Sequence, residues 1–150
     1  MSFSELLKRF RLMNSTQIKI SFEKPLLYIN AERKVVKCTL KGVLHLPKEV
    51  AKSLGYPEDL KVAARSTAVC KENDTFSEEK GIKIAIAQAE SNAYRNAAER
   101  LVRTWKRGND IVVDFLDEDN PTLNSKVNAF VRKANGCVTH NKRYITEIGA

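Results

Sequence analysis

The sequence contains few of the residues from which catalytic and metal sites are usually built. It has only two histidines, His45 and His140, and neither has a carboxylate or a cysteine at a metal-ligand spacing. Its three cysteines, Cys38, Cys70 and Cys137, are scattered and odd in number, which argues against a disulfide or zinc framework and for a reducing compartment. We therefore expect no metal site, no cofactor and a cytoplasmic location.

Membrane, nucleotide and calcium signals are also missing. No run approaches the ~20 apolar residues of a membrane span, and the charged N-terminal residues lack the cleavage site of a signal peptide. No glycine-rich loop resembles a phosphate cradle, and no serine lies in a nucleophile elbow. Asp117 and Asp119 begin like a calcium loop, but proline and threonine follow where a ligand and a glycine are needed. Asp114 and Asp117 are one helical turn apart, yet nothing marks them as catalytic, so we expect no enzymatic activity.

The charge is positive and unevenly distributed. The chain has 26 Lys and Arg against 18 Asp and Glu, a net charge of +8. Residues 1–50 have ten bases and four acids, whereas residues 108–120 have five acids and no base. A positive surface attracts polyanions through counterion release. We therefore expect a nucleic-acid surface in the N-terminal part, and we interpret the acidic segment 110–119 as a solvated connector.

A long helix from about Thr75 to Lys106 is the clearest structural prediction. Thr75 and Glu78 have the form of a capping box, and Gly108 is expected to end the helix. Small and apolar residues recur on one face at intervals of three and four: Ile82, Ile86, Ala89, Ala93, Ala97, Leu101 and Trp105. The alanines allow close packing against a sheet or another helix.

The length of this helix suggests a partner. About 31 residues at ~1.5 Å per residue make ~46 Å, whereas a domain of this size is only ~40 Å across. Either the helix breaks near Ser91-Asn92, or its far end overhangs and meets a second copy. We expect a homodimer through the long helix, which Ala93→Glu would dissociate.

The N-terminal half predicts a small antiparallel sheet. Alternating apolar residues indicate strands over Ile18–Phe22, Leu26–Ile29, Val36–Leu46 and Leu60–Cys70. A brief helix opened by a proline and ended by Gly55 lies between the last two strands. The whole chain, residues 1–150, is then one α+β domain: four to five strands packed on one long helix, with short N-terminal and C-terminal helices. Its β-rich part is 15–71, its helical part 74–135, and its basic tail 136–150.

Two of these strands alternate apolar residues with bases. Lys37 and Lys41 face away from the apolar residues of one strand, and Lys61 and Arg65 do so on the next. The simplest interpretation is a solvated face opposite a core. The alternative interpretation is a phosphate-binding face that positions the DNA backbone without reading bases. The predicted DNA contacts are Lys37, Lys41, Lys48, Lys61 and Arg65.

The segment Lys41–Val62 resembles the AbrB/SpoVT swapped-hairpin regulators. It has a strand ending in Leu46-Pro47, one helical turn closed by Leu54-Gly55, and a returning strand. An alanine replaces the arginine usual in that family, and the tight turn is one residue shorter. The resemblance implies an intertwined homodimer that binds DNA through basic residues, of which Lys41 and Lys48 match by position.

A second segment, Ala68–Ala89, is similar to one that recurs in short uncharacterised proteins of phages and prophages. The likeness consists of a strand ending at Cys70, then Asp74 with Phe76, then a helix containing Gly81. It implies a mobile-element origin and no particular activity. Each residue also has a structural role: a small buried thiol at Cys70, a helix cap at Asp74, packing by Phe76, and a close approach to the sheet at Gly81.

Two functions remain open on the sequence alone. The first is a non-enzymatic DNA-binding protein of a phage or mobile element. The alternative is a phage protein that acts on a host protein, or assembles with itself, without binding nucleic acid. The order of elements is also similar to double-stranded-RNA-binding domains, but the lysine cluster that those domains place at a helix entry is absent.

Overall fold

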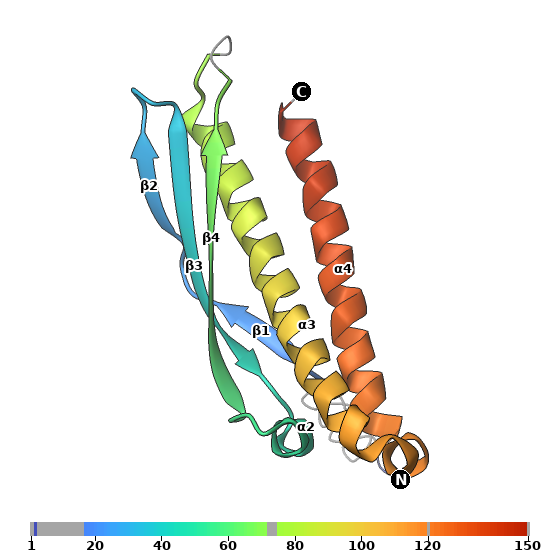
Figure 1. Cartoon of the computed structure of the whole chain (residues 1–150). Coiled ribbons are helices and arrows are strands. Elements are labelled where there is room, and N and C mark those ends of the chain that lie inside the picture. The colour runs from blue at the N-terminus through green and yellow to red at the C-terminus, as the bar shows by residue number, and fades with distance from the viewer. Residues whose placement is uncertain (1, 3–16, 72–74, 120, 150) are drawn as a thin grey trace.

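Four strands and three helices lie within the residues that the structure describes. The computed structural model describes residues 2, 17–71, 75–119 and 121–149, and the side chains of residues 106–125 are outside that description. The elements in order are β1 (Lys19–Phe22), β2 (Leu26–Asn30), β3 (Val35–His45), α2 (Lys48–Leu54), β4 (Asp59–Val69), α3 (Glu78–Asp119) and α4 (Pro121–Gly149). Helix α3 covers one face of the sheet, and α4 packs beside α3 (Figure 1). This arrangement confirms the predicted α+β class.

Strand β3 organises the sheet. It pairs along its whole length with β4, from Val35↔Val69 to His45↔Asp59. On its other edge β2 pairs with the first half and β1 with the second half, and all pairs are antiparallel. Each predicted strand lies within one residue of an observed one, because the alternation that identified it is a local signal.

The sheet face that contacts α3 forms the core together with both long helices. Along β3, the residues Val36, Cys38, Leu40 and Leu44 are no more than 3% exposed. Tyr94 of α3 links three elements, because its ring lies 5.8 Å from that of Phe22 in β1 and 6.1 Å from that of Phe130 in α4. Small residues of α3 fill the contact with the sheet: Ala85, Ala89, Ala93 and Ala97 are all buried.

Helix α3 lies close to the sheet at Gly81, as predicted. A Cβ added there would lie 2.7 Å from Cγ2 of Val36, so a larger residue would force a shift. The alanine face of the helix packs against other parts of the same chain, and Ala93 is only 2% exposed. A glutamate at Ala93 therefore tests folding before it tests association.

The ends of α3 differ from the prediction. The helix begins at Glu78 and not near Thr75, because Ser77 is the cap: its Oγ accepts a hydrogen bond from the Lys80 N–H at 3.3 Å. It continues past Gly108 to Asp119, so the predicted stop is wrong and the acidic segment 110–119 is helical. A glycine in a helix interior costs only about 1 kcal/mol, which other interactions can offset.

No break occurs near Ser91-Asn92, where both side chains bond to other elements. Asn92 Nδ2 donates to the Arg65 carbonyl of β4 at 3.0 Å. Ser91 Oγ accepts from Asn141 Nδ2 of α4 at 3.0 Å. These two residues fix the middle of α3 between β4 and α4.

The C-terminal helix is longer than predicted. The sequence predicts an end at Asn135-Gly136 and a basic tail beyond it, but α4 continues to Gly149. The reason is packing against α3, since the buried Asn141 also donates to the Ala87 carbonyl at 3.1 Å. Over the described residues, no helix has the length and apolarity needed to cross a membrane. The predicted N-terminal helix lies outside the described residues, apart from Ser2.

Candidate nucleic-acid interface

The second face of the sheet is left uncovered by α3 and α4 (Figure 1). Side chains of paired residues point to the same face and alternate along each strand, so the register fixes the composition of this face. We call it the open face. It consists of Lys19, Ser21, Leu26, Tyr28, Asn30, Val35, Lys37, Thr39, Lys41, Val43, His45, Asp59, Lys61, Ala63, Arg65, Thr67 and Val69.

Four of the five predicted contact residues lie on the open face. Lys37 pairs with Thr67, Lys41 with Ala63, Arg65 with Thr39 and Lys61 with Val43, and all four cations are exposed. Neighbouring strands lie about 4.8 Å apart, so the cations form a continuous group. Lys48 is also exposed, but it lies in the first turn of α2, beyond the end of β3.

Two contributions to the open face were missed from the sequence. Lys19 of β1 joins it opposite His45, as the alternation of Ile18, Ile20 and Phe22 could have shown. Tyr28 and Leu26 of β2 are 58% and 57% exposed and lie opposite Lys37 and Thr39. The strand was too short for its pattern to show which side faces outward.

The charge of this face is almost all positive. Asp59 is the one acid in the set, and it is the first residue of β4, where its Oδ1 is 2.7 Å from His45 Nδ1. The other ring nitrogen of His45 lies 3.0 Å from Ser21 Oγ. No ion pair of Lys19, Lys37, Lys41, Lys61 or Arg65 occurs within the part of the chain that the structure describes. Their charges are therefore available to an external anion.

A shallow hollow of about 410 Å³ lies at the upper part of the open face. Leu26 and Tyr28 border it on β2, and Arg65 and Thr67 border it on β4, with Lys37 between them. Single-stranded nucleic acids are usually bound by such a combination of backbone-tracking cations and exposed aromatic rings. The site therefore offers both electrostatic attraction and a stacking surface.

Two of the cysteines, Cys38 and Cys137, lie in surroundings that disfavour their thiolate forms. Burial raises the pKa of Cys38, and burial together with a hydrogen bond to Glu90 raises the pKa of Cys137 to about 12. The Cys137 thiol donates to Glu90 Oε1 at 3.1 Å, so it stays protonated and a poor nucleophile. Across the described ranges, no group of three or more His, Cys, Asp or Glu is placed to hold a metal ion.

No family model, curated protein or solved structure was found to match this chain.

Proposed function

We propose that this protein binds DNA through the open face of its sheet. The observation that carries the proposal is the register of β3 and β4, which gathers Lys37, Lys41, Lys61 and Arg65 on one uncovered face. The hydrophobic core uses only the residues of these strands that face α3. The cations on the open face are not needed for that core, and they strengthen attraction to phosphates. The protein acts here by binding, without a catalytic step.

The contacts are mainly to the sugar-phosphate backbone. Lysine side chains are long and flexible point charges, and they project from a sheet and not from a helix shaped to enter a groove. Phosphate contacts position a protein on nucleic acid but carry no sequence information. Tyr28 adds a surface on which an unpaired base can stack, so single strands and duplexes should both be compared as ligands.

The direct test reverses the charge of three open-face residues together: Lys37→Glu, Lys41→Glu and Arg65→Glu. The variant should lose the gel shift of the wild-type protein at low salt with both mixed-sequence duplex and single-stranded DNA. Its melting temperature should stay nearly unchanged, because all three side chains are exposed.

A matched control makes the same charge change on another surface. Arg132, Lys133 and Arg143 are exposed on α4, and their replacement by glutamate should leave most of the binding. Binding that survives the open-face change, or an equal loss in the control, would refute the assignment to this face. The mass of the native particle with and without DNA would report at the same time whether the protein binds as a homodimer.

A further inference from the structure

The outer edge of β4 is a second surface with binding capacity. One edge of β4 pairs with β3, and the described residues place no strand on the other edge. The Glu58 carbonyl and the Cys70 N–H bond toward the β3 side at 2.7 Å and 2.9 Å. Backbone groups alternate in direction along a strand, so those of Ala63, Arg65 and Thr67 point to the outer edge.

This edge borders a groove between β4 and the two long helices. One hollow of about 770 Å³ has α3 as its floor, at Gln88, Ser91 and Asn92, and α4 as its far wall, at Ile145. A second hollow of about 550 Å³ continues past Val69. The two share Gln88 and Ile145, so they form one groove along the upper part of β4.

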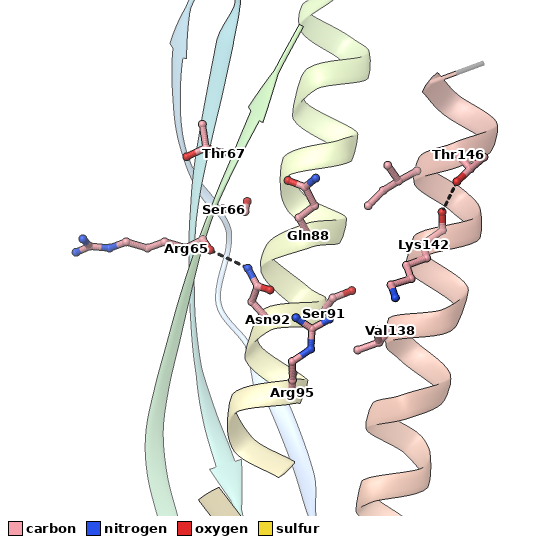
Figure 2. A pocket seen from close by; sticks show the side chains of 11 residues that line it. Arg65, Ser66, Thr67, Gln88, Ser91, Asn92, Arg95, Val138, Lys142 and Thr146 are labelled. Carbon is pink, nitrogen blue, oxygen red and sulfur yellow. Dashed lines mark hydrogen bonds between the residues drawn. The ribbon is translucent and has the colours of Figure 1, made fainter. Parts of the chain in front are cut away.

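Cations line both hollows of the groove. Arg95 of α3 and Lys142 of α4 border the first hollow, and Lys71 and Lys80 border the second. None of the described residues that line either hollow is acidic. Figure 2 shows Arg95 and Lys142 beside the hollow on the two helices, while Arg65 points away from it on the open face.

The edge already accepts one hydrogen bond from within the chain. Asn92 Nδ2 donates to the Arg65 carbonyl at 3.0 Å (Figure 2). Among the described residues, no hydrogen bond is found to the outward backbone groups of Ala63 or Thr67. Such groups are the usual template for strand addition.

We propose that this groove binds an extended acidic segment of a partner protein, which pairs with β4 as an additional strand. Side chains of an added strand alternate between the groove and the open face. They would meet Arg95 and Lys142 on one side and Lys61 and Arg65 on the other, so acidic residues are favoured at both sets of positions. A second copy of β4 would instead bring its own Lys61 and Arg65 to these cations.

This edge adjoins the open face and shares Lys61 and Arg65 with it, but its test has its own ligand. The probe is a fluorescein-labelled peptide with a Glu-Glu-Val repeat, which places glutamates on both faces of an extended strand, measured by fluorescence anisotropy. The wild-type protein should bind it, and a peptide with lysine in place of each glutamate should not. A third peptide, N-methylated at every residue, lacks the N–H donors of both strand edges and should bind at least about tenfold more weakly, as expected when several backbone hydrogen bonds are lost.

Two protein variants localise the peptide. Thr67→Pro removes an outward N–H that β3 does not use, which an edge strand tolerates, and it should weaken peptide binding, whereas Thr67→Val should not. Arg95→Glu with Lys142→Glu should also abolish peptide binding while the DNA gel shift remains. Three results would overturn the proposal: no binding of the acidic peptide to the wild-type protein, equal binding of the N-methylated peptide, or unchanged peptide binding by the Arg95/Lys142 variant. None of these three results requires that Thr67→Pro folds.

Discussion

The two faces of the sheet are made by alternate residues of the same strands, yet they have opposite environments. On β3, Leu44 is fully buried beneath the helices, while the adjacent Val43, and Lys41 two residues before it, lie on the open face beside β4. The inner face provides the apolar contacts that stabilise the fold. The open face contributes little to that core and carries the cations, so stability and binding should respond to different substitutions.

The largest effect is expected from truncating an inner residue. Leu44→Ala should lower the free energy of unfolding by about 2–5 kcal/mol, because it leaves a cavity in a fully buried site. Val43→Ala, one residue earlier on the open face, should cost less than about 1 kcal/mol. Urea denaturation followed by circular dichroism measures both. An equal loss of unfolding free energy in the two variants would mean that the open face is also packed against another part of the protein.

A smaller effect is expected where α3 touches the inner face. Gly81→Ala should destabilise the protein by about 1 kcal/mol despite the higher helix propensity of alanine, since the new Cβ would lie 2.7 Å from the branched and buried Val36. Gly136→Ala in α4 is the control, because nothing lies within 4 Å of its added Cβ. That variant should gain up to about 1 kcal/mol. Thermal melts in which both variants shift the melting temperature in the same direction would contradict the close contact at Gly81.

The contrast between the faces was predictable, because a period of two is visible within each strand. Lys37, Lys41, Lys61 and Arg65 were placed on one face from alternation alone, and the register confirms this placement. Features that depend on contacts between residues far apart in the sequence were not predictable in the same way. Asn135-Gly136 is an ordinary stop signal, and α4 passes through it because Asn141 and its neighbours pack on α3.

The groove beside β4 depends on tertiary packing alone. The cations of its first hollow, Arg95 and Lys142, are 47 positions apart in the sequence and meet only because α4 returns along α3. A local pattern cannot show such a meeting. The cap of α3 was missed for a simpler reason, since Thr75 and Ser77 are both acceptable cap residues and lie two positions apart.

Single substitutions on the open face should change binding and not stability. Lys41→Ala should weaken DNA binding a few-fold and reduce the slope of log K against log salt by about 1 for a duplex, as expected for the loss of one phosphate contact. The wild-type slope should be about −3 to −4 if Lys37, Lys41, Lys61 and Arg65 each contact a phosphate. Anisotropy titrations between about 50 and 200 mM salt give both values. A slope near zero would remove the electrostatic explanation.

The gentlest probe of the two faces is thiol reactivity, which leaves both stability and fold intact. Burial raises the pKa of Cys38 on the inner face, so at pH 8 it holds less thiolate than an exposed cysteine and is also shielded from reagent. A Lys41→Cys variant places a thiol three residues later on the open face. Iodoacetamide followed by mass spectrometry of each cysteine peptide should show modification at position 41 well before Cys38. Raising the pH should narrow the ratio of the two rates, because the thiolate at position 41 reaches its limit while that of Cys38, with its raised pKa, still increases. Shielding by the core should keep modification at position 41 faster until the protein unfolds. Rapid modification of Cys38 in the folded protein would show that α3 opens from the sheet. The inner face would then not be the permanently covered, stabilising face that the comparison requires.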